Sequence, residues 1–445
     1  MLLHLQTRQT PAYPVLIALA LFCCAMASCR QAPSPSAPRK VYIGQSEGRY
    51  TIFRDGQPFT IKGAAGNGQL KELSEAGGNT IRTWDTLQLG ALLDEAQAAG
   101  IAVIAGLSIP ASESLDFYRD TIAVSALCMA YEQLVERYKN HPALLMWCLG
   151  NEVDFPYRPR FRPFYKAYNR LLDMIHARDP DHPVTTTLIN FNRRNIYNLR
   201  WKVPQLDLIS LNIFGELKNL RSDLRKFSWF WNGPFLITEW GINGPWETET
   251  TAWGAPVEST SNKKAEQYLQ RYTDYMPVND PRFLGACVFF WGQKQEVTHT
   301  WFSLFAQNGE ASASAHALQY IWTGQRASHQ APAFQYMLLE GKGARDNILL
   351  SPGTIHSAEL LLESPGSDSL RFEWEVVPED WFIRFRYDVN PQKPPVLDSL
   401  LISHEGTTAR FRAPSREGPY RIFVTAFDAY GNFASTNTPF YVIAP

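Results

Sequence analysis

Cysteine is scarce in this chain of 445 residues, and the few that occur suit neither a disulfide framework nor a zinc site. Three of the six lie within the first 29 residues, and the other three, Cys128, Cys148 and Cys287, each lie inside an apolar stretch. The sequence has no Cys-x-x-Cys and no His-Glu-x-x-His motif. An odd number of cysteines in apolar surroundings predicts buried free thiols.

Charge of either sign is not in excess, since 42 Lys and Arg oppose 43 Asp and Glu for a net charge of −1. A protein whose main partner is nucleic acid normally carries a basic surplus, so that class is not favoured. The apolar run at residues 15–27 has 13 residues, whereas a helix that spans a bilayer needs about 20. The chain is nevertheless 45% apolar and 13% aromatic, which permits a large core.

The short apolar run follows Arg8 and is typical of a secretory signal, so residues 1–28 are expected to be a removed leader. It ends at Met26-Ala27-Ser28-Cys29, which resembles a bacterial lipobox with Met in place of the usual Leu. We therefore expect a lipid on Cys29, a Pro/Ser tether over 29–40, and a location in the bacterial cell envelope. The alternative is an ordinary cleaved signal peptide.

Residues 41–331 alternate short apolar strands with helical stretches, after an opening hairpin turned at Asp55-Gly56. Near-continuous apolar runs are typical of parallel strands buried on both faces. Eight strand and helix pairs predict an α/β fold, a (β/α)8 TIM barrel. The glycine-rich stretch at 63–68 lacks a following Lys-Ser pair, so nucleotide binding is not favoured. The expected strands are 59–64, 79–83, 101–107, 143–149, 184–188, 207–213, 235–239 and 284–290.

The sequence pattern changes in residues 332–445, where short segments of alternating apolar and polar residues are separated by turn residues such as Ser-Pro-Gly and Glu-Gly-Pro. Helical periodicity fades there. The pattern predicts a C-terminal all-β sandwich of the immunoglobulin-like type. This segment contains no cysteine, so the inter-sheet disulfide of antibody domains is absent.

Two carboxylates are expected at the mouth of the barrel, where strands end and function usually lies. Glu152 follows the fourth strand and Glu239 ends the seventh. Glycoside cleavage needs such a pair, one protonated to release the leaving oxygen and one ionised to attack the anomeric carbon. We expect burial and repulsion to raise the pKa of one acid, and hydrogen bonds from Asn or Arg to keep the other ionised.

The motifs around both carboxylates resemble a known family. WCLGNE at 147–152 resembles the acid/base motif of clan A glycoside hydrolases, and FLITEWG at 235–241 resembles their nucleophile motif. FTIKGAAGNG at 59–68 and GGNTIRTWD at 77–85 are similar to the start of the family 2 barrel. The resemblance covers about residues 50–300. It implies retention by double displacement, without metal or organic cofactor, with Glu152 as acid/base and Glu239 as nucleophile about 5 Å apart.

The resemblance also implies roles for neighbouring residues. Asn151 would bind the sugar 2-hydroxyl, Arg82 would support the nucleophile, and Trp291 would form the floor of the cleavage subsite. The family often has a Tyr where this chain has Phe214, so that hydroxyl must come from elsewhere or be absent. The remaining candidate substrate contacts are Trp84, Asn212, Phe214, Trp240 and Trp246.

The preferred hypothesis is a retaining endo-β-glycosidase, a monomer whose partner is a β-linked polysaccharide. A lone barrel with an immunoglobulin-like domain is similar to laminarinase-type endo-β-1,3-glucanases, with β-mannan or β-galactan as the next substrate classes. The same machinery suits a transglycosylase. Alternatives of other classes are a non-catalytic surface glycan-binding lipoprotein, which predicts loss of a carboxylate, and an envelope scaffold, which predicts no aromatic-lined cleft.

Overall fold

The structure is a computed structural model that describes residues 40–363, 370–379 and 392–444. The expected leader at 1–28, the lipid site at Cys29 and the expected tether up to residue 39 lie outside the described residues. Within them, no helix has the length and apolarity to cross a bilayer. Cys128, Cys148 and Cys287 are buried free thiols, which confirms that expectation.

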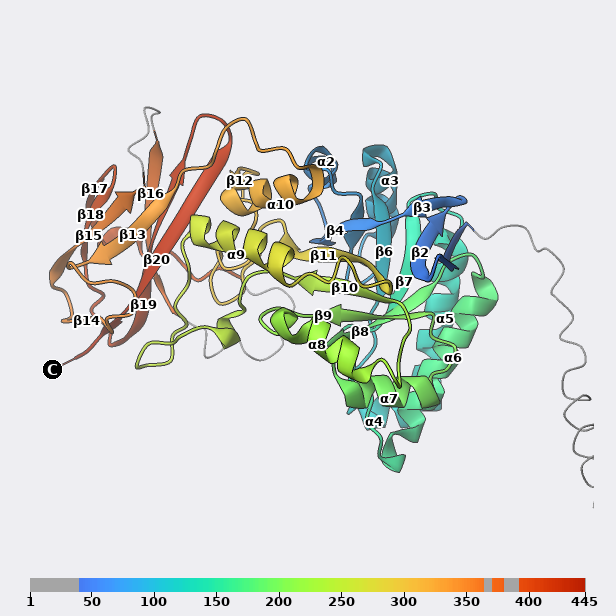
Figure 1. Ribbon diagram of the computed structural model, residues 1–445. Helices are drawn as coiled ribbons and strands as arrows, with labels where there is room; N and C mark the ends of the chain where they lie inside the picture. Colours follow the sequence, from blue (N-terminus) through green and yellow to red (C-terminus); the bar gives the residue numbers. More distant parts are fainter. Residues whose placement is uncertain (1–39, 364–369, 380–391, 445) are drawn as a thin grey trace, which may run out of the picture. The chain divides into compact units, whose positions relative to one another are not determined.

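Eight parallel strands close into a barrel, which confirms the TIM-barrel prediction (Figure 1). The barrel strands are mostly buried on both faces, and β6 and β7 are buried along their whole length. The strands are β4 (Ile61–Gly66), β5 (Thr80–Arg82), β6 (Ala102–Leu107), β7 (Leu144–Leu149), β8 (Val184–Ile189), β9 (Leu208–Asn212), β10 (Phe235–Trp240) and β11 (Phe283–Trp291), and β11 pairs with β4 to close the ring.

Helices surround the barrel and turn an apolar stripe towards it. In α8 the buried residues Leu217, Leu220, Leu224 and Phe227 recur at spacings of three and four. The helices are α2 (Leu70–Glu75), α3 (Leu89–Ala99), α4 (Leu115–Arg119), α5 (Thr121–Tyr138), α6 (Arg162–Arg178), α7 (Arg193–Lys202), α8 (Leu217–Phe227), α9 (Ser261–Asp274) and α10 (Ala313–Thr323), with short 3-10 turns η1 (Pro159–Phe161) and η2 (Pro245–Glu247).

The N-terminal hairpin is a separate small sheet of β1 (Val41–Ser46), β2 (Arg49–Arg54) and β3 (Gln57–Phe59). Phe59, expected in the first barrel strand, instead pairs with Ile52 of this sheet. The Asp55-Gly56 turn has the expected left-handed backbone at both residues.

The C-terminal part contains two sheets that enclose an apolar core of their own, as predicted for a sandwich; their long strands pair antiparallel, whereas the two-residue strands β12 and β14 pair parallel with β20. One sheet has the order β12-β20-β19-β16, with β14 beside β20, and the other has the order β13-β15-β18-β17. Their bounds are β12 (Ala311–Ser312), β13 (Phe334–Leu339), β14 (Leu349–Leu350), β15 (Ile355–Leu362), β16 (Arg371–Pro378), β17 (Leu401–Glu405), β18 (Thr408–Arg412), β19 (Gly418–Phe427) and β20 (Asn432–Val442), with a 3-10 turn η3 (Asp398–Leu400).

The strands β19 and β20 are buried along most of their length because their outer face packs on the barrel. Glu258 of the loop after β10 accepts hydrogen bonds from Lys264 (2.5 Å) and from Asn437 of β20 (2.7 Å). Arg421 of β19 donates to the carbonyl of Pro256 over 2.8 Å. This buried polar network ties the 241–260 loop to the sandwich.

Candidate active site

Four strand ends bring the predicted polar residues to one mouth of the barrel. Arg82 ends β5, Asn151 and Glu152 follow β7, Asn212 ends β9, and Glu239 lies next to the end of β10. Successive side chains of a strand point to opposite faces, and the hydrogen bonds described below show that these five converge on the barrel interior. The chain segments that supply them are far apart in the sequence and meet only through closure of the sheet.

Glu239 is buried and held by two donors on the same oxygen. Its Oε1 accepts from the Arg82 guanidinium over 2.6 Å and from the Trp84 indole Nε1 over 2.7 Å. Arg82 is fully buried, and its guanidinium lies 4.7 Å from the centre of the Trp84 ring. Within the described chain no donor contacts Oε2, so this oxygen is the one available to a ligand.

Burial raises the pKa of Glu239 to about 7. The Arg82 cation and the Trp84 hydrogen bond oppose the increase, whereas the neighbouring charges of Glu152 and Glu296 add to it. The sequence led us to expect burial on one carboxyl and Arg or Asn support on the other. The structure places burial and Arg support together on Glu239, because Arg82 is itself buried beside it, whereas Asn212 donates to Glu152.

Glu152 lies at the entrance and is exposed to solvent. The chain reaches it through two residues in the left-handed region, Gly150 with φ 84° and Glu152 with φ 54°. A side chain at Gly150 would lie 2.4 Å from Val153, so the turn after β7 requires glycine. This turn directs Glu152 towards Asn212, whose Nδ2 donates to Glu152 Oε1 over 3.0 Å.

A chain of hydrogen bonds connects the two carboxylates. Asn151 Oδ1 accepts from Arg82 and, over 3.2 Å, from Asn212 Nδ2, which also binds Glu152. The Thr238 hydroxyl donates to Asn212 Oδ1 over 3.0 Å and fixes the orientation of that amide. Asn151 Oδ1 is thus occupied, and among the described residues no acceptor contacts its Nδ2, so that donor is available to a ligand.

Aromatic side chains form one wall of the mouth. Phe214 packs edge-on against Trp246 of the loop after β10 and against Phe289 of β11, each at 5.7 Å between ring centroids. Phe290 stacks on Trp84 at 5.8 Å. Trp246 is 53% exposed, so its indole face is available at the rim. The sequence predicted Phe214, Trp84 and Trp246 as substrate contacts, whereas Phe289 and Phe290 lie in the expected strand 284–290 and were not among the predicted site residues.

Two predicted substrate contacts are not brought to the mouth. Trp240 follows Glu239 directly and therefore points to the opposite face of β10, where it is 1% exposed and packs on Tyr268 and Tyr272 of α9. Trp291 is also 1% exposed, packs on Trp322 and donates its Nε1 to a backbone carbonyl over 3.0 Å. The pairing of β11 with β4 shifts register just before it, which turns the side chain away from the mouth.

One pair of charged residues near the site was not anticipated. Glu296, in the loop after β11, forms an ion pair with Lys294 at 3.3 Å. Burial raises the pKa of Glu296, and the charge of Glu152 contributes to the increase. Lys294 lies 5.6 Å from the Phe289 ring centre and 5.7 Å from the Phe290 ring centre. Sequence inspection offered no signal for this pair beyond its position after the last barrel strand.

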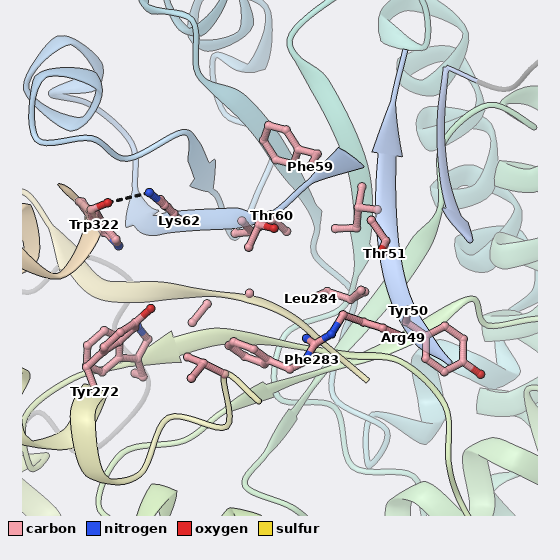
Figure 2. Close-up of a pocket in the computed structure, with 16 residues that line it drawn as sticks. Arg49, Tyr50, Thr51, Phe59, Thr60, Lys62, Tyr272, Phe283, Leu284 and Trp322 are labelled. Atoms are coloured by element: carbon pink, nitrogen blue, oxygen red, sulfur yellow. Dashed lines mark hydrogen bonds between the residues drawn. The ribbon is translucent and has the colours of Figure 1, made fainter. Parts of the chain in front are cut away.

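The mouth continues into an open depression of about 610 Å³ on the Glu152 side, lined by Glu152–Asp154 and by residues 189–195. A different cavity, of about 200 Å³, lies between β2 and the barrel strands β4 and β11 (Figure 2). Its lining residues, Trp240 among them, include no carboxylate, and Lys62 there donates to the Trp322 carbonyl over 2.6 Å. The candidate catalytic carboxylates therefore lie at the mouth of the barrel and not in this cavity. Across the described residues no cluster of His, Cys, Asp and Glu has the arrangement of a metal site.

Comparison with known proteins agrees with the barrel fold. Residues 87–243 match the family model for "Glycosyl hydrolases family 2, TIM barrel domain". The β-glucuronidases of Faecalibacterium prausnitzii and Bifidobacterium dentium are each 18% identical with a TM-score of 0.50, and cover 64% of this chain. A family 2 β-galacturonidase from Eisenbergiella tayi is 15% identical with a TM-score of 0.50 and also covers 64%. The matched regions are 52%, 49% and 54% of those chains, so this chain spans about half their length.

Proposed function

We propose that this protein hydrolyses β-glycosidic bonds with retention of configuration, a proposal supported by the match of residues 87–243 to the glycosyl hydrolases family 2 TIM barrel domain. The observation that carries the proposal is the arrangement of the two carboxylates. Glu239 is buried and fixed by Arg82 and Trp84 through a single oxygen, and Glu152 is exposed and linked to it through Asn151 and Asn212.

The first step is attack of Glu239 Oε2 on the anomeric carbon while Glu152 donates a proton to the leaving oxygen. In the second step Glu152 takes a proton from water, which attacks the glycosyl ester and releases Glu239 as the carboxylate. Arg82 and Trp84 hold Oε1 throughout, so the free oxygen keeps its direction towards the sugar. Asn151 Nδ2 offers a donor to the sugar 2-hydroxyl.

Endo action on a polysaccharide is supported by the open depression beside Glu152 and by the exposed indole of Trp246 at the other wall. Among neutral polymers, β-1,3-glucan is the preferred substrate, followed by β-mannan and β-galactan. The test is a panel of aryl β-glycosides and these polymers, with product sizing. Release of short internal fragments from at least one β-glycan is expected, and the Glu239→Gln variant should bind but not cleave it. Equal turnover by Glu239→Gln contradicts the nucleophile assignment, and products longer than the substrate indicate transfer to a sugar instead of water.

For location, we propose that a lipid on Cys29 holds the enzyme, as a monomer, at the cell envelope. The apolar run at 15–27 and the Met26-Ala27-Ser28-Cys29 motif support this proposal.

A further inference from the structure

A basic and aromatic surface lies on the Glu152 side of the molecule, and the catalytic steps do not use it. Three segments form it: residues 157–166, 193–202 and 216–231, which we call together the α7 surface. They contain twelve Lys or Arg residues and two acidic ones, in a chain whose net charge is −1. Positive charge is thus concentrated here, and the rest of the sequence carries the balancing negative charge.

Contacts between the segments show that they form one continuous surface. Lys202 of α7 donates to the Tyr157 carbonyl over 2.9 Å. Arg193 of α7 pairs with Asp223 of α8 at 3.0 Å, and Tyr197 stacks on Phe230 at 5.0 Å. The neighbouring positions of α7 and α8 are visible in Figure 1.

The surface exposes large aromatic rings among its cations. Trp201 is 68% exposed, Trp229 81%, Tyr157 64% and Tyr197 52%. Tyr197 and Trp201 lie one helical turn apart, with ring centroids 6.5 Å from each other. Of the twelve cations, only Arg193 and Arg194 form ion pairs with carboxylates of the described chain.

The α7 surface is continuous with the proposed active site. The depression of about 610 Å³ that begins at Glu152 is lined on its far side by Arg193 and Arg194, the first residues of α7. When the cleaved bond of a polymer lies at Glu152, the leaving-group side of that polymer therefore lies next to α7. Eight of the twelve cations are arginines, whose planar guanidinium groups bind carboxylate and sulfate oxygens in pairs.

We propose that the α7 surface binds the leaving-group side of a β-glycan that carries anionic groups, carboxylate or sulfate. The arginines bind the anions, and the exposed Trp and Tyr faces stack on sugar rings. The preferred substrate is thus an acidic polysaccharide, and neutral β-1,3-glucan is the poorer one. This inference rests on the proposed glycosidase function for its substrate, but its binding test does not require turnover.

The test uses the full chain with Glu239→Gln, so that bound polymer is not cleaved. Affinity is measured for β-1,3-glucan, for its carboxymethylated and sulfated derivatives, and for vesicles containing phosphatidylglycerol. The two derivatives distinguish carboxylate from sulfate as the recognised anion. The expected result is binding of at least one anionic derivative about tenfold or more tighter than the neutral polymer, weakened as salt screens the charges.

Surface variants locate the binding. Arg200→Glu and Trp201→Ala should each weaken binding of the anionic polymer about tenfold. In the catalytically intact chain the same substitutions should leave turnover of small aryl β-glycosides unchanged. The matched controls are Lys71→Glu on α2, which follows the barrel strand opposite β8, and Tyr320→Ala on α10. Neither control should change binding.

Equal affinity for neutral and anionic polymers overturns the proposal, and so does unchanged binding in both surface variants. Binding to the vesicles without binding to either derivative also overturns it, and identifies the α7 surface as membrane-binding. Failure of the proposed glycosidase function can be told apart from failure of the α7-surface proposal. It appears as absent turnover of aryl β-glycosides and polymers by the catalytically intact chain, whatever the binding result.

Discussion

The indole N–H of Trp84, two residues after Arg82 in the loop that follows β5, donates to Oε1 of Glu239 over 2.7 Å. Phe214 occupies the position where the resembled family often has a Tyr, so the sequence predicted that a hydroxyl contacting the nucleophile comes from elsewhere or is absent. The structure shows that Trp84 supplies a donor to this carboxylate instead. Trp84 also packs against Phe289 and Phe290, so one side chain both orients Glu239 and forms part of the mouth wall.

Substituting Trp84 by Phe keeps an aromatic ring and removes the donor. A hydrogen bond to a charged group contributes about 1.5–3 kcal/mol, so kcat/KM should fall about 10- to 100-fold. Trp246→Phe is the matched control, because Trp246 has no bond to either carboxylate, and it should affect KM more than kcat. Steady-state kinetics on an aryl β-glycoside give both values. A Trp84→Phe enzyme with unchanged kcat/KM would show that the indole N–H has no role in orienting Glu239.

Retention can be tested by chemical rescue of the nucleophile. A Glu239→Gly variant should lose activity by about four orders of magnitude or more. Azide should then restore release of the aryl leaving group, because it occupies the space of the missing carboxylate, and the product should be the α-glycosyl azide. NMR of the first product of the unmodified enzyme should show the β-anomer. An α-configured first product, together with no azide rescue, would mean inversion.

The ionisation of Glu239 is expected to determine the acid limb of the pH profile of kcat/KM. Its pKa is about 7, and it must be ionised to attack, so on the acid side of the profile kcat/KM should rise with pH through about 7. Glu296→Gln removes a negative charge that raises this pKa, so the limb should move to lower pH. Glu75→Gln, on the exposed surface of α2, is the control and should leave the limb in place. If the acid limb does not move in Glu296→Gln, the charge of Glu296 does not influence the pKa of Glu239.

The buried ion pair between Glu258 and Lys264 predicts loss of stability in acid. Although burial alone raises the pKa of Glu258, the Lys264 and Arg421 cations hold it below its ordinary value. A depressed pKa stabilises the fold at pH above the ordinary Glu value, and this contribution disappears as pH falls through the folded-state pKa.

Glu258→Gln should lower the free energy of unfolding by about 3–5 kcal/mol at neutral pH, since it leaves the Lys264 charge buried without its partner. Glu266→Gln breaks an exposed, solvent-screened pair with Lys263 and should change the free energy of unfolding far less. Denaturant unfolding at pH 7 and at acidic pH measures both effects. Similar losses in the two variants would contradict the role given to the buried pair.

The lipid anchor has a direct test in the cell. Cys29→Ala should move the protein from the membrane fraction to the soluble fraction and abolish incorporation of a labelled fatty acid. Cys128→Ala, at a buried cysteine of α5, is the control and should leave labelling intact. Continued lipid labelling of Cys29→Ala would refute the anchor.

The sequence by itself determined the barrel, the sandwich and the pair of catalytic candidates, because hydrophobic periodicity and strand-end motifs are local properties. Glu152 and Glu239 could be named from the residues beside them. Tertiary structure alone decided what surrounds them. From the sequence alone, Trp240 and Trp291 were predicted to contact the substrate. Strand alternation turns Trp240 away from the mouth, and a register shift turns Trp291 away from it. The donor from Trp84, the charge of Glu296 and the α7 surface depend on contacts between segments far apart in the chain, which only closure of the sheet and packing of the helices bring together.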